Sequence, residues 1–417
     1  MTSTQNDNQY KTALIGWSLP SIEAADELGR PFVIVGPPHC EQYAEKYDLP
    51  FIAWDFDHYK KHYSMEDVWE QSEELYQLLK EENTGLAVPL FEDTVEWAAA
   101  VNGRIKEDPK VFRHSLLFRH KGKMKRRALL GGLKVGVFEE ANNKEEVKQF
   151  FRRVNDAMLK AGEEEQDPVH VKAFDKAGDV GHRIIRTEAD IDALEDEAFP
   201  NLVESHLDGV EVSCEVFVHN GTIQFLNITE YIVFGYSMMA PPSPEIEKQR
   251  KKIRGAVQAL IRAFDIQYGL IHPEFFIDEE GKISFIEVAA RIPGGNIFDL
   301  IKKTYDFNPF QAHILCSDPN TSEEELQSFF PKERKSKGHA GSLMVYPRVK
   351  TIEKLHVPEE LEEHPGFDRH TMFTPAQRKV PEMEGFGNPQ GVVFFHHDNH
   401  DHVREPLRDY VDFDFYI

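Results

Sequence analysis

The sequence has few cysteines and no long apolar run. Only Cys40, Cys214 and Cys316 occur in 417 residues, and they lie far apart. An odd number of widely spaced thiols excludes a disulfide framework and a tetrahedral metal site built from cysteine. No apolar stretch approaches the ~20 residues that cross a bilayer, and the polar N-terminus does not resemble an export signal. We therefore expect a cytoplasmic protein with no membrane partner.

Positive charge is also scarce. The chain has 48 Lys and Arg residues against 72 Asp and Glu residues, a formal net charge of -24. Such a chain repels nucleic acid on average, so nucleic acid is excluded as a partner. Against this background the seven Lys or Arg residues within 113–127 stand out. A small polyanion would need a local cluster of this kind.

The sequence contains enough apolar material for several cores. Hydrophobic residues make up 41% of the 417 residues, and a soft prior of ~150 residues per domain predicts more than one domain. Residues 1–112 alternate apolar runs with amphipathic stretches, a pattern typical of βαβ units in a parallel sheet. The turn at residues 16–20 lacks the three-glycine phosphate fingerprint of dinucleotide-binding folds. We expect a Rossmann-like domain without its cofactor motif.

The pattern changes after Pro109. Residues 169–173 and 183–186 read as a hairpin, and Asp208-Gly209 and Asn220-Gly221 are typical turns of two further hairpins. A helix over 244–264 and a hairpin over 270–288 follow, and the last ~80 residues read as short strands and loops of a small final unit. The fold class is therefore α/β, with an antiparallel sheet in the second half.

Two acidic residues in the hairpin 270–288 form the most informative feature. If Asp278 to Gly281 is a four-residue turn, Glu274 lies opposite Phe285 and diagonal to Glu287. Both carboxylates then share one face among apolar neighbours, where two ionised groups repel strongly. A cation bound by oxygen ligands, Mg²⁺ or Mn²⁺, would relieve that repulsion. The alternative is a solvent-facing hairpin with ordinary surface glutamates.

Basic residues form a second set. Lys121 and Lys172 are candidate phosphate ligands in an acidic chain, and Lys172 precedes the segment Ala177 to Gly181, whose glycines would let backbone amides approach phosphate oxygens. A plain hairpin turn is the alternative for that segment. A nucleic-acid patch is the alternative for the run 113–127, and the net charge opposes it.

From about residue 110 to residue 305 these pieces resemble the ATP-grasp superfamily, most of all its L-amino acid ligase branch. The resemblance implies an ATP-grasp fold of four parts, with a Rossmann-like domain (1–112), a central domain with the ATP lid (113–203), a core with the metal site (204–330) and a small β-rich unit (331–417). It also implies roles for individual residues. ATP would be held by Lys121, Lys172, Gly178, Gly181, Val203, Glu204, Leu207 and Glu211, and magnesium by Glu274 and Glu287, with Arg291 steadying the transferring phosphate.

Three positions depart from the family pattern. His120 stands where an Asp is usual, and Asp179 stands where a Ser is common, which puts a negative charge near phosphate. Ala289 replaces a third metal ligand, an Asn in many members. The Glu-x-Ala-Ala-Arg form is familiar from the amino acid ligase branch.

The resemblance implies phosphoryl transfer from ATP to a carboxylate, followed by attack of an amine on the acyl phosphate, with amino acids as the expected substrates. Arg291 and amides of the Gly294-Gly295 loop would stabilise the oxyanion. His272 is one option for the amine's base, and a packed histidine is the other. The loop Tyr236 to Met239 would wall the acceptor pocket or pack against the final unit.

Two other functions stay open. One is an ATP-grasp carboxylase that activates bicarbonate, and the other is a nucleotide-sensing module that has lost turnover. The histidine-rich segment 396–402 reads as a transition-metal site or, more simply, a solvated turn between two late strands. Whether the chain forms a homodimer is also open.

Overall fold

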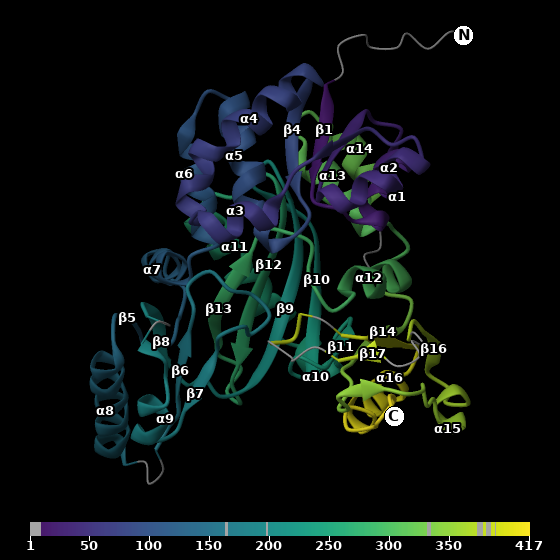
Figure 1. Cartoon of the computed structure of the whole chain (residues 1–417). Coiled ribbons are helices and arrows are strands. Elements are labelled where there is room, and N and C mark those ends of the chain that lie inside the picture. Colours follow the sequence, from purple (N-terminus) through teal and green to yellow (C-terminus); the bar gives the residue numbers. More distant parts are fainter. Residues whose placement is uncertain are drawn as a thin grey trace.

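The computed structural model describes residues 10–162, 166–196, 199–331, 335–372, 378–380, 385–387 and 389–417. A helix-covered parallel sheet lies at the top of Figure 1, a long sheet runs through the middle, and two smaller lobes lie below on either side. The chain is therefore a mixed α/β structure, as the sequence predicts. No helix in these described segments is both long and apolar enough to cross a membrane.

The N-terminal region forms a four-stranded parallel sheet in the order β3-β2-β1-β4. Its central strands are buried because apolar runs such as Phe32-Val-Ile-Val lie between helices on both faces. The predicted βαβ pattern is confirmed here. The strands are β1 (Lys11–Ile15), β2 (Phe32–Gly36), β3 (Phe51–Ala53) and β4 (Thr84–Pro89), and the helices are α1 (Leu19–Leu28), α2 (Glu41–Lys46), α3 (Phe56–His62), α4 (Val68–Glu81), α5 (Val95–Ile105) and α6 (Pro109–Ser115).

The lobe at the lower left of Figure 1 is a separate antiparallel sheet of order β5-β8-β6-β7. The predicted hairpin is confirmed, with Val169 opposite Ile185. Helix α8 packs Val147 and Phe150 against this sheet, which gives the lobe its own small core. Its elements are α7 (Lys121–Leu130), which leads into the lobe, β5 (Phe138–Ala141), α8 (Lys144–Ala161), β6 (Val169–Lys172), β7 (Arg183–Ile185), α9 (Glu188–Asp192) and β8 (Asn201–Ser205).

The long sheet has eight strands in the order β13-β12-β9-β10-β11-β14-β18-β16. The Asn220-Gly221 hairpin is confirmed, since Thr222 lies opposite His219. The Asp208-Gly209 hairpin is wrong, because β8 belongs to the lobe and β9 to the long sheet. A Cβ on Gly209 would lie 2.2 Å from the carbonyl oxygen of Ile277, so this glycine lets the chain cross closely from one sheet to the other. The strands are β9 (Val210–His219), β10 (Thr222–Val233), β11 (Ser237–Ala240), β12 (Gly269–Ile277) and β13 (Ile283–Ala289).

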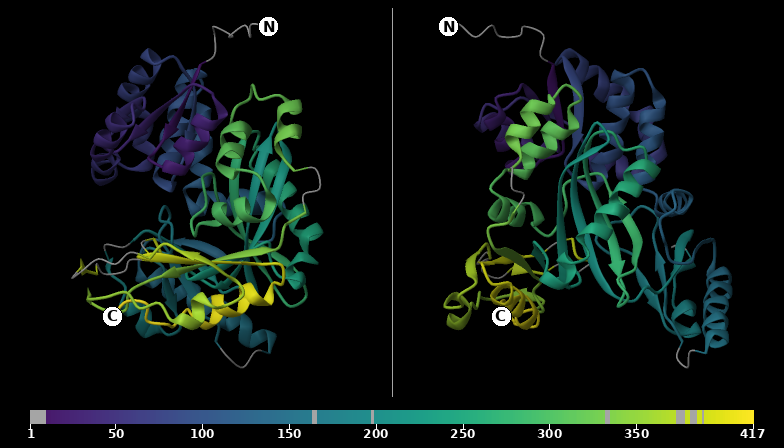
Figure 2. Two further views of the ribbon diagram at one scale, coloured as in Figure 1. Left: turned by 90° about the vertical axis from the view of Figure 1, so that its right-hand side faces the viewer. Right: turned by 180° about the vertical axis from the view of Figure 1, so that it is seen from behind.

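The C-terminal residues continue the long sheet, although the sequence predicts a small unit of short strands. Strand β14 pairs with β11, so the last strands extend the same hydrogen-bonded ladder. Figure 2 shows this end of the sheet, in yellow, lying below the N-terminal region. Its strands are β14 (His339–Val345), β16 (Phe367–His370) and β18 (Gly391–His397), with β15 (Thr351–Ile352) and β17 (Arg378–Lys379) as a separate pair.

Helices cover the long sheet. The predicted helix over 244–264 is interrupted and consists of α10 (Pro244–Glu247) and α11 (Arg250–Ala263). An aromatic cluster centred on Phe217 and Phe225 packs between the sheet and the helices that follow β13. The remaining helices are α12 (Ile297–Tyr305), α13 (Pro309–Ser317), α14 (Glu323–Phe329), α15 (Glu359–Glu362) and α16 (Asp401–Asp409).

We expect Phe217→Ala to lower the free energy of unfolding by about 3–5 kcal/mol, the usual cost of a large cavity in a core. Phe217 is fully buried and its ring lies against Phe225, Phe298 and Phe330. Urea unfolding measures the change. Val137→Ala, at a side chain that is 62% exposed, is the control and should shift stability by less than about 0.5 kcal/mol.

Candidate active site

Glu274 and Glu287 lie directly opposite each other on β12 and β13. The sequence predicts a diagonal pair, and that register is wrong for two reasons. The turn has five residues, since Ile277 pairs with Ile283, and a bulge follows Glu274. Both carboxylates still share one face of the sheet, as predicted, and direct pairing brings them closer than a diagonal would.

Glu274 is fixed by two neighbours. Tyr231 on β10 donates a hydrogen bond from its hydroxyl to Glu274 Oε1 (3.0 Å), and His272 Nε2 lies 3.3 Å from the same oxygen. The other nitrogen of His272, Nδ1, is 3.1 Å from Glu215 Oε1. Burial alone would lower the pKa of His272, but its contacts with Glu215 and Glu274 raise the pKa to about 9. Neither Tyr231 nor Glu215 is predicted from the sequence.

Glu287 is held by Lys121, the first residue of α7. Lys121 Nζ lies 3.1 Å from Glu287 Oε2 and donates to the carbonyl oxygen of Lys176 (2.7 Å). A third carboxylate, Glu211 on β9, shares this region, and burial together with Glu274 and Glu287 raises its pKa well above the ordinary value. The face therefore concentrates negative charge.

These residues fit a divalent cation that is shared with phosphate. No group of three or more His, Cys, Asp or Glu side chains is arranged as a full ligand set in the described parts of the chain. Two carboxylates suffice for Mg²⁺ in nucleotide sites, because phosphate and water oxygens complete its shell. Glu211, Glu274 and Glu287 lie close enough for their charges to interact, and such an ion would offset that concentration of negative charge.

A buried ion pair joins α7 to β8. Lys125 Nζ lies 3.1 Å from Glu204 Oε2, and the two side chains are only 2% and 7% exposed. Lys172 at the end of β6 approaches the same oxygen at 3.9 Å. Lys125 was not singled out from the sequence, although it lies one helical turn after Lys121 and so on the same side of α7. Three lysines therefore converge on the predicted nucleotide site.

Arg291 is paired with the N-terminal region. Its Nε lies 2.7 Å from Oε2 of Glu92, which opens the 3-10 helix η3 (Glu92–Thr94) before α5. Arg119 Nη1 binds the other oxygen of Glu92 at 2.6 Å. Burial raises the pKa of Glu92, but Arg291 and Arg119 outweigh it and hold the pKa at about 2. Neither Glu92 nor Arg119 was predicted from the sequence, because their partners are remote in the chain.

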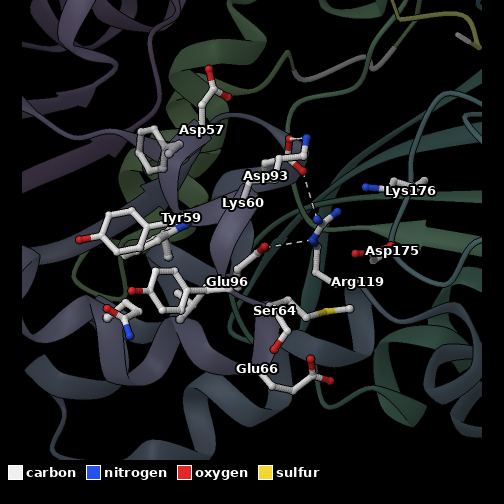
Figure 3. Close-up of a pocket in the computed structure, with 16 residues that line it drawn as sticks. Asp57, Tyr59, Lys60, Ser64, Glu66, Asp93, Glu96, Arg119, Asp175 and Lys176 are labelled. Atoms are coloured by element: carbon white, nitrogen blue, oxygen red, sulfur yellow. Dashed lines mark hydrogen bonds and ion pairs between the residues drawn. The ribbon is translucent and has the colours of Figure 1, made fainter. Parts of the chain in front are cut away.

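Arg119 also borders a pocket of about 210 Å³ on the N-terminal side of this network. Figure 3 shows its guanidinium between Asp93 and Glu96, with Asp175 and Lys176 of the lobe facing it across the opening. Phe56, Trp97 and other aromatic residues also line this pocket. The predicted site residues do not line this pocket.

The predicted lid loop and hinge lie beside the lysines. Gly178 and Gly181 have positive φ angles of 62° and 74°, which suit glycine, and the carbonyl oxygen of Gly178 accepts a hydrogen bond from Phe386 N (2.8 Å). Val203 is fully buried on β8. Leu207, which follows β8 in the chain, packs against Gly136. These residues all come from one sheet or its flanking loops.

His120 acts as the cap of α7. Its Nδ1 accepts a hydrogen bond from the backbone N–H of Lys123 (3.3 Å), and its ring stacks on Phe174 with centroids 4.5 Å apart. A neutral imidazole nitrogen can accept in the way an Asp oxygen does. The replacement of Asp at this position therefore keeps the start of α7.

Three further expectations need correction or completion. Ser237 to Met239 form part of β11 instead of a loop, and Met239 is fully buried in the C-terminal core. Gly295 lies against Met238, and its carbonyl oxygen accepts from Ser342 Oγ (2.7 Å). The segment 396–402 joins β18 to α16, so it does not link two strands.

The part of the sequence that builds most of this site matches a known domain family. Residues 169–299 match the family model of the ATP-grasp domain, a span that includes Lys172, Glu204, Glu274, Glu287 and Arg291. The chain therefore carries an ATP-grasp domain, and the recognition made from the sequence is confirmed. No curated protein matches the sequence.

Solved structures share the fold over nearly the whole chain. The L-amino acid ligase from Bacillus licheniformis is 20% identical with a TM-score of 0.72, covering 98% of this chain and 99% of that one. Carboxyaminoimidazole ribonucleotide synthase from Aspergillus clavatus, complexed with ATP, is 15% identical with a TM-score of 0.68, covering 97% and 99%. The biotin carboxylase domain of Hydrogenobacter thermophilus 2-oxoglutarate carboxylase, with MgADP and bicarbonate, is 16% identical with a TM-score of 0.66, covering 98% and 90%. At these identities the likeness establishes the fold.

Removing one partner of the buried pair should destabilise the protein. We expect Lys125→Met to cost about 3–5 kcal/mol in the free energy of unfolding, because it leaves the Glu204 carboxylate buried without its nearest cation. The double variant Lys125→Met/Glu204→Gln should recover much of that loss. Equal losses in the single and double variants, measured by urea unfolding, would argue against a coupled pair.

The Glu92 network predicts a pH dependence of stability. The pKa of Glu92 lies at about 2, below the ordinary value of 4.5, so its contribution is complete above pH 4.5 and is lost as the pH falls towards 2. The difference corresponds to about 3 kcal/mol. The free energy of unfolding should therefore fall less between pH 5 and pH 2.5 in Glu92→Gln than in the wild type, as unfolding curves recorded at each pH would show. Glu41→Gln, at an exposed carboxylate, is the matched control.

Proposed function

We propose that the protein is an ATP-dependent carboxylate–amine ligase, which forms an amide or dipeptide bond through an acyl phosphate and releases ADP and phosphate. The observation that carries this proposal is the direct opposition of Glu274 and Glu287 on one face, with Lys121 bound to Glu287. The match of the ATP-grasp domain to the same strands supports it.

ATP would bind between the lobe and the long sheet. In this proposal residues 113–203 form the central domain with the lid, and residues 204–330 form the core with the metal site. Lys121 and Lys172 would offset phosphate charge, and the backbone at Gly178 and Gly181 would approach the phosphates. The adenosine would be held by Val203, Glu204, Leu207 and Glu211. Glu274 and Glu287 would hold Mg²⁺ or Mn²⁺, which supplies charge stabilisation at the β- and γ-phosphates when bound.

Arg291 is proposed to steady the transferring phosphoryl group. The ion pair with Glu92 holds the Arg291 guanidinium through Nε, and Arg291 Nη1 donates a hydrogen bond to the carbonyl oxygen of Ile292 (2.9 Å). A preorganised cation costs less reorganisation during the reaction. The negative charge of the carboxylate substrate would also be attracted to the Arg291 guanidinium.

His272 is a positioning residue in this proposal instead of the amine's base. Both of its ring nitrogens are taken up by Glu215 and Glu274, so neither is left to accept a proton from an amine. Its contacts fix the orientation of Glu274.

Amino acids are the proposed substrates, in line with the similarity to an L-amino acid ligase structure. A carboxylase that activates bicarbonate is the second candidate, because structures of that kind share the fold to a similar degree. Both reactions need water kept from the acyl or carboxy phosphate, which closure of the lid would provide.

The test is a screen of amino acid pairs with Mg²⁺ and ATP, with ADP and coupled product measured together. Amine-dependent release of phosphate with formation of an amide is the expected result, and release that depends on bicarbonate alone would favour the carboxylase. Binding of ATP without any release would overturn both enzymatic assignments.

Glu287→Gln should reduce turnover by at least about 10²–10³-fold, since it removes one of two proposed metal ligands while keeping size and packing. Glu280→Gln, on the exposed turn of the same hairpin, is the control and should retain activity. Thermal unfolding checks that both variants fold. Wild-type rates of ADP formation in Glu287→Gln would contradict the proposed metal site.

A further inference from the structure

A buried polar stripe crosses one face of three neighbouring strands of the long sheet. Its members are Ser213 and Glu215 on β9, Asn227 and Thr229 on β10, and His272 on β12, and all five are buried. Asn227 lies directly opposite Glu215, and Thr229 lies opposite Ser213. The alternate residues of β9 belong to the apolar core on the other face. Polar side chains cost free energy to bury, so packing alone does not explain this stripe.

Glu215 is the centre of the stripe, and four donors surround its carboxylate. Ser213 Oγ donates to Oε1 (3.0 Å), and His272 Nδ1 lies 3.1 Å from the same oxygen. Asn227 Nδ2 (2.6 Å) and Thr229 Oγ1 (2.8 Å) donate to Oε2. A carboxylate has about four acceptor sites, so this carboxylate is filled by donors from three strands. Its position in the sheet is therefore fixed.

His272 connects this fixed carboxylate to the proposed metal site. Its Nδ1 faces Glu215, which turns Nε2 towards Glu274, and Nε2 lies 3.3 Å from Glu274 Oε1. The Tyr231 hydroxyl donates to the same oxygen (3.0 Å). Both neighbours thus engage Oε1, and no hydrogen bond or ion pair between described residues engages Oε2 of Glu274. Oε2 is therefore the oxygen that can bind a cation.

We propose that Glu215 is a positioning residue for the metal site. It turns His272 so that this ring, together with Tyr231, holds Oε1 of Glu274 and leaves Oε2 to the divalent cation. The inference rests on the proposed function for the cation and the nucleotide. Outer-shell partners of this kind orient the carboxylates that bind a metal, and their loss typically weakens metal binding about 10- to 100-fold.

Glu215→Met tests the inference, because an unbranched apolar side chain of similar length offers His272 no acceptor. Mn²⁺ is titrated into protein saturated with ADP, and the EPR signal of free Mn²⁺ gives the dissociation constant. Glu215→Met should weaken Mn²⁺ binding about 10- to 100-fold. Its affinity for ADP without metal should change less than about twofold, whereas general damage to the sheet would weaken both.

Two matched variants separate positioning from support of the sheet. Glu215→Gln keeps an oxygen that can face His272, and its amide can donate to Asn227 Oδ1, a buried atom without a partner among the described residues, once the Asn227 amide turns. Thr229→Val removes a donor to Oε2 and leaves the contact with His272. Both variants should bind Mn²⁺ within about threefold of the wild type.

A double variant shows whether the effect passes through His272. In a His272→Phe background, Glu215→Met should weaken Mn²⁺ binding by less than about threefold, because the ring no longer links the two carboxylates. A further loss of about tenfold or more in that background would overturn the inference. Wild-type Mn²⁺ affinity in Glu215→Met would overturn it as well.

Thermal unfolding checks that each variant folds. If Glu215→Met does not fold, Glu215→Asp replaces it with the same expected loss, because the shorter side chain draws the carboxylate back from His272. Wild-type protein that bound ADP but no Mn²⁺ would overturn the proposed metal site and this inference together. Unchanged Mn²⁺ binding in the Glu215 variant overturns the inference alone.

Discussion

The structure depends on balancing carboxylates that the long sheet and the lobe gather in one place. Glu204, Glu211 and Glu287 come from different strands, yet each affects the pKa of the same lysine, Lys172. Like charges in a partly buried region repel strongly unless cations lie among them. The lysines that meet this need are carried by α7 and β6, and the pair of Lys121 with Glu287 links α7 to the long sheet.

A second set of ion pairs joins the N-terminal region to the same site. Arg119 is 5% exposed and lies among Glu92, Asp93 and Glu96, while Glu92 reaches across to Arg291. Buried charges of this kind contribute little net stability against an apolar alternative, but leaving one unpaired is costly. Their effect here is geometric, because they fix the direction of Arg291 from a region that supplies none of the proposed nucleotide ligands.

The sequence predicts what depends on local pattern. Strand alternation placed Glu274 and Glu287 on one face, and turn residues placed the hairpins at 169–186 and 220–221. The register is wrong because the turn has five residues and a bulge follows Glu274, and neither feature leaves a clear mark in the residues. The Asp208-Gly209 turn was misread because the same dipeptide allows a tight crossing between two sheets. The local sequence pattern does not show which sheet a strand joins.

Partners that are remote in the chain were not predictable in the same way. Glu92 and Arg291 are 199 residues apart, and β14 pairs with β11 although about 100 residues of chain lie between the two strands. No periodicity relates such positions. Lys125 is different, since its spacing from Lys121 is local and a buried face of α7 was visible in principle. Lys125 was not predicted because the run 113–127 holds many basic residues, and the sequence does not show which of its lysines point inward and which point into solvent.

Two contacts from other parts of the chain hold the predicted lid loop. Lys121 donates to the carbonyl oxygen of Lys176, and Phe386 N donates to that of Gly178, whereas the pair of His182 with Asp179 lies within the loop itself. None of these contacts needs a ligand, so an ordered loop can exist before nucleotide arrives. The first contact uses the lysine that also holds Glu287. A single side chain therefore links the position of the loop to the charge at the proposed metal-binding face.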